Sequence, residues 1–180
     1  MGYPGKSRKS FDKPSHPWQG ARISEEAELV KKYGLKNKRE IWKAATTLRK
    51  YRREARKLLF DIQEVGERGE HAKDESEKFL NRLKRIGLIK YDATLDDILA
   101  LRIEDLMDRR LQTQVHKNGL ANSMRHARQL IAHGHIAVNG RRITIPSYLL
   151  PASEQELISF YEGSPLYEAA GSEKQVSAGD

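Results

Sequence analysis

The strongest pattern of apolar and polar positions in the chain runs from about Lys38 to about Val65. Its apolar residues alternate between spacings of three and four, which places them on one face of a long helix. These residues are Ile41, Ala44, Leu48, Tyr51, Ala55, Leu58 and Ile62. Because the stripe extends over only about three heptads, we expect it to pack against other helices of the same chain rather than to form a coiled-coil dimer.

Shorter helices are predicted on both sides of this long helix. Ser24, with glutamates in the turn that follows it, is expected to begin a helix that ends at Gly34. After a loop over residues 66–71, apolar spacing predicts a helix over residues 73–86, and the segment 94–97 resembles a capping box that opens one more short helix. The apolar residues just before residue 102 are expected to pack this region firmly against the rest of the chain.

The pattern changes beyond residue 103 to short elements. One helix is predicted over residues 106–117, because Met107, Leu111 and Val115 lie four apart. A second helix is expected to begin at a cap provided by Asn122 or Ser123 and to end at Gly134. Two short helices joined by a small turn would form a helical hairpin.

Short strands are predicted after these helices. Residues 135–138 and 141–143 flank Asn139–Gly140, a dipeptide that suits a two-residue turn with positive φ at both positions. A further strand is predicted over residues 156–161. The chain is therefore expected to have a mainly helical α+β fold with a small antiparallel sheet.

Charge is distributed along the chain in blocks. The 180 residues carry a net charge of +8, with 17 basic and 6 acidic residues in the segment 1–60. The segment 109–150 contains seven basic residues and no acidic residue, whereas 61–108 and 151–180 are net acidic. Basic residues without acids in their own segment favour binding to a polyanion, so two basic blocks separated by an acidic one indicate two nucleic-acid-facing surfaces.

The segment 109–150 also suggests where a phosphate would bind. The Asn–Gly turn puts Arg141 and Arg142 just past its tip, and the N-terminus of the second short helix offers free N–H groups beside Arg125. Arg128 and Gln129 are three and four residues beyond Arg125, so all three are expected to share a solvent-facing side of the helix. For any one of these arginines, a solvated polar face on a small core is an equally good interpretation.

Two further groups of basic residues are candidates for RNA contact. In the segment 1–22, which is rich in Gly and Pro and has no periodicity, they are Lys6, Arg8, Lys9 and Lys13. On several sides of the long helix they are Lys43, Arg49, Lys50, Arg52, Arg53, Arg56 and Lys57. The aromatic residues Tyr3, Phe11 and Trp18 of the first segment are suited to stacking on exposed bases, although a flexible tail without a role is the alternative.

Signals for catalysis or cofactor binding are missing from the sequence. It has no glycine-rich phosphate loop and no cysteine, and its histidines lack the acidic and sulfur ligands that would complete a metal site. It also has no apolar run long enough to cross a membrane and no signal-peptide pattern. We therefore expect a non-enzymatic cytoplasmic protein without metal, cofactor, membrane partner or small-molecule substrate.

A long motif in the second half resembles a known family. The residues S-x-R-x-A-R-Q-L-I-x-H-G-H-I-x-V-N-G-R-R, from Ser123 to Arg142, followed by I-P-S-Y, resemble the RNA-binding domain named after small-subunit ribosomal protein S-four. That resemblance implies an α-L-type fold that grips structured RNA. It implies RNA contact for Arg109, Arg110, Ser123, Arg125, Arg128, Gln129, His133, His135, Asn139, Gly140, Arg141 and Arg142.

The resemblance extends over the rest of the chain to the archaeal and eukaryotic type of the S-four ribosomal protein family. It rests on G-Y-P-G-K at the start, the long basic helix, and L-x-I-E-D-L-M-D-R-R-L-Q-T-Q-V from Leu101. It implies a structural constituent of the small ribosomal subunit that binds ribosomal RNA early, helps nucleate the subunit body, contacts ribosomal protein S-five and affects translational accuracy. The alternatives are an RNA-modifying enzyme, for which the remaining helical residues leave too little room, and a ribosome-associated quality-control factor.

Together these patterns divide the chain into four parts. Residues 1–22 are expected to form an extended basic arm and residues 23–102 a helical domain. Residues 103–166 are expected to form the S-four-type RNA-binding domain, and residues 167–180 a disordered tail.

Overall fold

The computed structural model describes residues 9–63 and 67–167. Lys6, Arg8 and Tyr3 of the predicted arm, and all but the first residue of the predicted tail, lie outside the described residues. Within them, helices predominate and a three-stranded antiparallel sheet lies in the second half of the chain. This architecture confirms the predicted mainly helical α+β fold.

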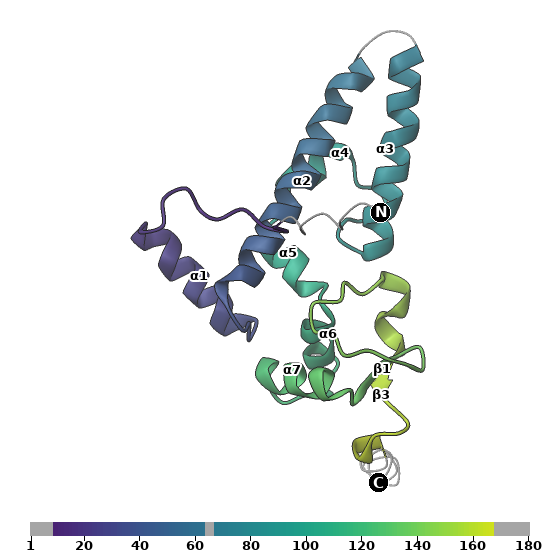
Figure 1. Ribbon diagram of the computed structural model, residues 1–180. Coiled ribbons are helices and arrows are strands. Elements are labelled where there is room, and N and C mark those ends of the chain that lie inside the picture. Colours follow the sequence, from purple (N-terminus) through teal and green to yellow (C-terminus); the bar gives the residue numbers. More distant parts are fainter. Residues whose placement is uncertain (1–8, 64–66, 168–180) are drawn as a thin grey trace, which may run out of the picture.

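Helix α2 (Lys38–Gln63) and helix α3 (Glu67–Ile86) lie side by side as a long hairpin that extends away from the rest of the molecule (Figure 1). The predicted apolar stripe of α2 is its buried face, from Ile41 to Leu58. It packs within one hydrophobic cluster together with Phe79 and Leu83 of α3. The apolar stripe of α2 thus packs against helices of the same chain, as its short length predicts.

Helix α3 begins at Glu67, so the loop predicted over residues 66–71 is wrong for residues 67–71. The buried face of α3 continues toward its start through the small residues Gly69, Ala72 and Ser76. Small residues allow close packing but are not apolar enough to register in a hydrophobic periodicity, which is why the sequence pattern misses this part of the helix.

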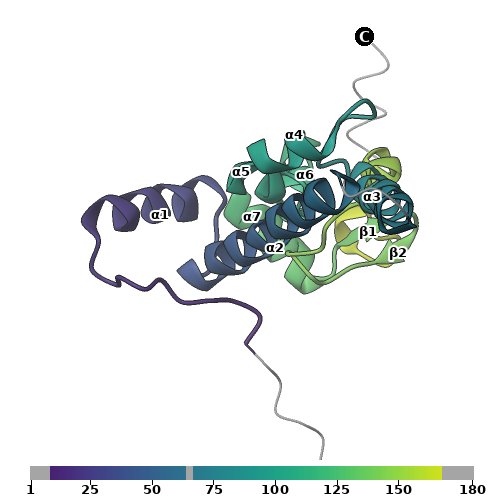
Figure 2. The ribbon, with the colours of Figure 1, turned by 90° about the horizontal axis from the view of Figure 1, so that it is seen from above.

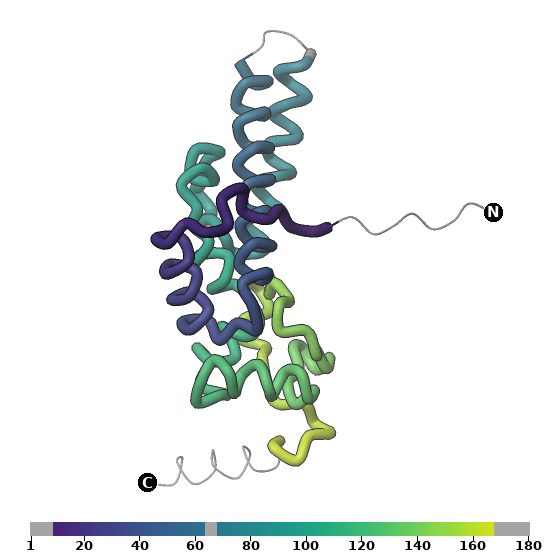
Figure 3. The backbone as a smooth tube through the Cα atoms, turned by 60° about the vertical axis from the view of Figure 1, so that its left-hand side comes forward, coloured from purple at the N-terminus to yellow at the C-terminus, as the bar shows by residue number. Residues whose placement is uncertain are grey.

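Helix α1 (Gly20–Lys32) begins four residues before Ser24, the predicted start, and takes in the end of the predicted arm. Arg22 stabilises this additional turn, because its guanidinium donates hydrogen bonds to the carbonyl oxygens of His16 and Pro17 and to the Glu26 carboxylate. The preceding residues 9–19 contain no helix or strand, and the chain crosses α2 before it turns into α1 (Figure 3). Viewed from above, α1 lies on one side of α2 and α3 on the other (Figure 2).

Short capped helices lead from the hairpin to the second half of the chain. Helix α4 (Leu95–Ala100) opens on the predicted capping box, in which the Thr94 N–H donates to the Asp97 carboxylate at 2.8 Å. Helix α5 (Ile103–Asp108) begins in the same way, with the Arg102 N–H donating to Asp105 at 2.7 Å. Leu106 and Met107 of α5 belong to the hydrophobic cluster of α2, so the predicted firm packing near residue 102 is confirmed.

The helix predicted over residues 106–117 is two helices, α5 and α6 (Leu111–Lys117). The chain between them is extended at Arg110, which forms a bridge with Leu149, and the Leu111 N–H donates to the Tyr148 carbonyl oxygen at 2.8 Å. Met107, Leu111 and Val115 keep a spacing of four across the break, although Met107 packs in the cluster of α2 and the other two pack in a second hydrophobic cluster. The sequence pattern alone therefore reads them as one.

Helix α7 (Met124–His133) and the sheet complete the second half. Ser123 caps α7 by accepting the His126 N–H, and Gly134 ends the helix with φ of 78°. The sheet has the order β2–β1–β3, with β1 (Ile136–Val138) between β2 (Arg141–Arg142) and β3 (Ile158–Phe160). The strand predicted over residues 156–161 is shorter than expected, because residues up to Leu157 belong to the 3-10 helix η1 (Ala152–Leu157).

Two hydrophobic clusters result, one under α2 and one formed by α6, α7, β1 and β3. They meet where the loop after α1 touches the start of α7. Gly34 has φ of 55°, and a Cβ atom added there would lie 2.9 Å from the Cβ of Met124. Gly34 is thus required both by its backbone conformation and by the close approach of the two halves.

A graded series of glycine substitutions should separate these two requirements. Gly119 also has positive φ but has open space around it, and Gly20 has open space and an ordinary helical backbone. Gly20→Ala should be neutral or slightly stabilising. Gly119→Ala should cost about 1–2 kcal/mol, and Gly34→Ala about 1–3 kcal/mol more, because Met124 must also be displaced. Urea unfolding of the three variants would test the order, and equal losses at Gly34 and Gly119 would contradict the close approach.

Candidate nucleic-acid interface

Helix α7 presents several of the predicted contact residues to solvent. Arg125, Gln129 and His133 are exposed along it, and among the described residues no hydrogen bond or ion pair engages the side chains of Arg125 and Gln129. The cap at Ser123 holds the first turn of the helix beside Arg125. These exposed side chains are available to an anion.

The β1–β2 hairpin has the predicted turn. Asn139 and Gly140 have φ values of 50° and 72°, as a two-residue turn between twisted strands requires. Arg141 and Arg142 follow the tip and are exposed. The Arg142 guanidinium donates to the His133 carbonyl oxygen at 3.2 Å and lies over the Tyr161 ring, which holds it near the end of α7.

His135 differs from its neighbour His133 in having an intramolecular partner. Its Nδ1 lies 2.8 Å from the Ser164 hydroxyl, and its side chain is partly buried. The two imidazole rings are 6.2 Å apart. Among residues 9–63 and 67–167 there is no group of His, Asp and Glu side chains placed to hold a metal ion.

Arg109 and Arg110 lie between α5 and α6, where their side chains join parts of the protein. Arg109 donates to the Ile86 carbonyl oxygen at 2.8 Å and to the Gln155 side chain at 2.9 Å, and burial lowers the pKa of its guanidinium. Arg110 is only 7% exposed and donates to Glu40 at 2.6 Å and to the sulfur of Met107. Both arginines therefore have structural partners that the sequence does not reveal.

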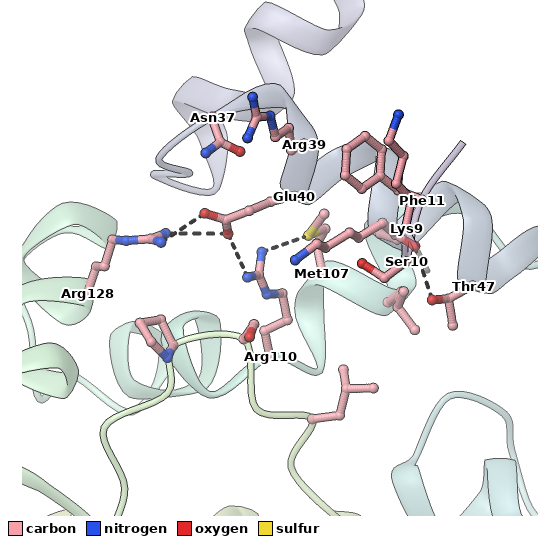
Figure 4. Close-up of a pocket in the computed structure, with 16 residues that line it drawn as sticks. Lys9, Ser10, Phe11, Asn37, Arg39, Glu40, Thr47, Met107, Arg110 and Arg128 are labelled. Atoms are coloured by element: carbon pink, nitrogen blue, oxygen red, sulfur yellow. Dashed lines mark hydrogen bonds and ion pairs between the residues drawn. The ribbon is translucent and has the colours of Figure 1, made fainter. Parts of the chain in front are cut away.

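Arg128 also binds the Glu40 carboxylate, on the side opposite Arg110. Its guanidinium donates to Glu40 Oε1 at 2.8 Å and to Gln112 Oε1 at 3.3 Å. The prediction that Arg128 shares the solvent-facing side of Arg125 and Gln129 is wrong, because Glu40 of α2 draws Arg128 into the contact between the two halves of the protein. Figure 4 shows the Glu40 carboxylate between the two guanidinium groups.

Gln112 extends this network to the backbone. It is 1% exposed, and its Nε2 donates to the carbonyl oxygens of Tyr33, Gly34 and Met124 at 2.8–3.1 Å. We call Glu40, Arg110, Gln112 and Arg128 the interdomain clasp. It connects the start of α2 and the loop before it to α6 and α7.

Opposing effects act on the ionisation of Glu40. Burial alone would raise the pKa of its carboxyl, but the hydrogen bonds from Arg128 and Arg110 outweigh burial and hold the pKa below its ordinary value of 4.5. The ionised form therefore contributes stability that is present above about pH 4.5 and is lost as the pH falls through the lowered pKa.

The basic residues of α2 are mostly exposed, as predicted. Arg52 is the exception, because it is partly buried and donates to the Leu101 carbonyl oxygen. Arg49 is exposed but pairs with Asp12 of the arm at 2.9 Å, and Lys57 lies 3.9 Å from Asp61. Among the predicted contact residues of α2, those left with exposed cationic groups and no ion pair that the structure describes are Lys43, Lys50, Arg53 and Arg56, and Arg39 of the same helix is likewise exposed.

The described part of the arm rests on α2. The Asp12 N–H donates to the Thr46 hydroxyl at 3.1 Å, and the Phe11 ring lies 5.9 Å from the Trp42 ring. Lys9 and Lys13 are exposed, and Trp18 is 92% exposed. Of the aromatic residues predicted to stack on bases, Phe11 thus has a partner within the protein, and Trp18 is open to solvent.

A cavity of about 650 Å³ lies between the arm, α2, α5 and α7, with Glu40, Arg110 and Arg128 of the clasp in its wall (Figure 4). Its charged lining combines side chains from both halves of the chain. The basic ones are Lys9, Arg39, Lys43, Arg110 and Arg128, and the acidic one is Glu40. This surplus of positive charge makes the cavity suited to an anion.

Arg39, Glu40 and Gln112 were missed as site residues by sequence reasoning. One signal could have indicated Glu40: it is the only acidic residue between Glu28 and Glu54, and a basic segment without acids of its own must find its partners elsewhere. Nothing local marks Gln112, because its role depends on carbonyl groups about 80 residues away.

Both halves of the chain match known proteins in sequence. The model of the S4 domain matches residues 109–155. The small ribosomal subunit protein uS4 of Methanocella arvoryzae is 51% identical over 92% of this chain and 82% of its own length. That of Methanothermobacter thermautotrophicus is 48% identical over 99% of this chain and 97% of its own length.

The chain belongs to the uS4 family of small ribosomal subunit proteins. A third relative, from Halobacterium salinarum, is 47% identical over 92% of both chains. The matches cover the helical domain as well as the S4 domain. Of the helices that the structure describes, none is both long and apolar enough to span a membrane.

The two kinds of arginine in this uS4 protein should respond differently to substitution. Arg109→Met should lower the free energy of unfolding by about 1–3 kcal/mol, because it leaves the Ile86 and Gln155 acceptors without their donor. Arg125→Met should leave stability nearly unchanged and weaken RNA binding. Thermal unfolding and RNA titration of both variants would test this division. A stable Arg109→Met protein, or an Arg125→Met protein with unaltered RNA affinity, would contradict it.

The hairpin tip offers a test of geometry at constant charge. Gly140 has positive φ and nothing within 4 Å of an added Cβ, so Gly140→Val should cost about 1–3 kcal/mol from backbone strain alone. The strain should displace Arg141 and Arg142 and thereby weaken RNA binding. Asn139→Gly keeps the turn and should cost much less.

RNA titrations of wild type, Gly140→Val and Asn139→Gly would decide this, with amide hydrogen exchange to check folding. Wild-type affinity in Gly140→Val would show that the position of the two arginines does not depend on the turn.

Proposed function

We propose that this protein is a structural constituent of the small ribosomal subunit that binds small-subunit ribosomal RNA. The observation that carries the proposal is the set of exposed cationic side chains, free of ion pairs in the described structure, on a chain 47–51% identical to uS4 proteins over nearly its full length. Cationic side chains without acidic partners bind phosphates by releasing counterions, and A-form RNA is recognised mainly by shape and backbone.

The RNA-contacting residues we propose come from three parts of the chain. In the S4 domain they are Arg125, Gln129 and His133 on α7, together with Asn139, Gly140, Arg141 and Arg142 in the hairpin. On α2 they are Lys43, Lys50, Arg53 and Arg56, and in the arm Lys9 and Lys13. Ser123 and His135 support these side chains by capping α7 and by fixing the strand beside the hairpin.

The remaining candidates would act mainly through the fold. Arg109, Arg110, Arg128 and Arg52 donate to groups of the protein, and Arg49 and Lys57 have acidic neighbours. Removal of one of these side chains should change the shape of the RNA-binding surface as well as its charge. RNA contact by Lys6 and Arg8 remains part of the proposal on the basis of sequence.

The family also suggests how this RNA contact would be used. We propose early binding at a junction of ribosomal RNA helices, a role in nucleating the subunit body, contact with ribosomal protein S-five and an influence on translational accuracy. We further propose that the protein acts in the cytoplasm. An RNA-modifying enzyme is not favoured, because outside the S4 domain the described chain consists of the helical domain and the arm.

Fractionation of ribosomal particles would test the proposed function. The protein should sediment with mature small subunits and remain there after a wash in moderate salt. A variant with Arg125→Ala and Arg141→Ala should be released at lower salt, because fewer phosphates are neutralised. Recovery of the wild-type protein mainly in free form, or with large subunits, would overturn the proposal and favour a quality-control factor.

A further inference from the structure

The two basic surfaces meet at the interdomain clasp. Glu40 lies in the first turn of α2, and the exposed basic residues of α2 follow it along the same helix. Arg128 lies in α7, one turn after Arg125 and next to Gln129. One carboxylate thus connects the helix that carries the first basic block to the helix that carries the second.

The geometry of Glu40 suits a positioning role. Its Oε1 accepts from Arg128 at 2.8 Å, and its Oε2 accepts from Arg110 at 2.6 Å and from Arg128 at 3.4 Å. Charge-assisted hydrogen bonds of this kind are directional, so they fix the orientation of both arginines as well as their distance. Gln112 closes the network, since its amide binds the backbone on both sides of the contact.

The same carboxylate lies in the wall of a cavity that is otherwise basic. Arg39 and Lys43 flank Glu40 on α2 and are exposed, and the Arg128 side chain is 26% exposed beside them. An acid in a phosphate-binding cavity lowers the attraction for RNA unless it provides something else. Here it holds Arg128 and α7 in register with α2.

We propose, on the basis of the function proposed above, that Glu40 is a positioning residue for RNA binding, holding α2 and α7 on either side of a cavity that receives a phosphate of the RNA backbone. Arg39, Lys43 and the exposed edge of Arg128 contact the phosphate, and Arg110 supports the carboxylate from within. The two basic blocks then act as one preformed surface, which avoids the entropic loss of ordering two separate surfaces on the RNA.

If Glu40 has this positioning role, its replacement should change RNA affinity in the direction opposite to the one expected from charge alone. Replacing an acid by a neutral residue adds positive charge to the protein, which by itself should tighten RNA binding. Glu40→Gln should instead weaken binding of a small-subunit ribosomal RNA fragment on the order of tenfold, because the two surfaces lose their register. The slope of log affinity against log salt should also become shallower by about one, as expected when a phosphate contact is lost.

Glu104 provides the matched control. It is also an ion-paired acid, 2.8 Å from Lys32, but it does not line the cavity. Glu104→Gln makes the same change in net charge and should bind RNA as well as wild type or slightly more tightly. In an Arg128→Gln background, Glu40→Gln should have little further effect on affinity, because its effect passes through Arg128.

All titrations are made where circular dichroism shows the variant to be folded. Glu40→Asp serves as a second variant, because its side chain keeps the charge but is too short to reach both arginines. Its affinity for RNA should lie between those of wild type and Glu40→Gln. If Glu40→Gln does not fold, the RNA affinity of Glu40→Asp tests the positioning role in its place. Wild-type or tighter binding by folded Glu40→Gln or, in its place, by Glu40→Asp would overturn the proposal.

A measurement without RNA separates this inference from the proposed function. The chain has no cysteine, so spin labels can be attached through Glu54→Cys on α2 and Ala132→Cys on α7, both exposed positions. The distance distribution should be narrow with Glu40 and broad with Glu40→Gln. An equally narrow distribution in both would overturn the positioning role. A broadened distribution in a protein whose wild type shows no preference for small-subunit RNA would instead count against the proposed function.

Discussion

Two arginines of the S4 domain share the carboxylate of Glu40, and the relative placement of the two halves of this protein depends on that contact. Burying a charged group is costly unless it is paired and hydrogen-bonded, and here each partner supplies what the other needs. Burial alone would raise the pKa of the Glu40 carboxyl, but the hydrogen bonds from Arg128 and Arg110 hold this pKa below its ordinary value. Met124 and Leu149 of the second half also pack against the hydrophobic cluster of α2, so the clasp, the close approach of Gly34 to Met124 and this apolar contact together join the two halves.

The arginines of the second basic block have accordingly divided into two groups. One group is directed inward, where the planar guanidinium can bind several carbonyl, amide and carboxylate acceptors at once, as Arg109 does with Ile86 and Gln155. The other group, including Arg125 and Arg141, is left without partners in the described structure. The inward group holds in place the part of the protein on whose surface the outward group lies.

In the first basic block, too, one of the basic residues has a partner within the protein. Asp12 of the arm pairs with Arg49 and its N–H binds Thr46, so the arm lies against α2 and not apart from it. This contact is exposed, and surface ion pairs contribute little stability. The pair therefore adds little to the stability of the fold.

Local signals were sufficient for much of the fold. The stripe of α2 is visible because its spacing repeats every three or four residues, the Thr94–Asp97 and Ser123 caps because they act within one turn, and the Asn139–Gly140 turn because its backbone conformation suits few other residues. The S4-type motif over Ser123–Arg142 was equally visible, and with it the RNA-binding class of the protein. These features depend on residues that are neighbours along the chain.

Only the tertiary structure decided which basic residues are available. Arg110 and Arg128 find Glu40 at separations of 70 and 88 residues, and Arg109 finds Gln155 at 46. A count of charges within one segment contains no information about such partners, so the Arg128 side chain was expected to be free in solvent and Glu40 was overlooked. The start of α3 was missed for a related reason: Gly69, Ala72 and Ser76 are buried by the close approach of α2, which depends on the packing of two helices and not on the apolar character of either.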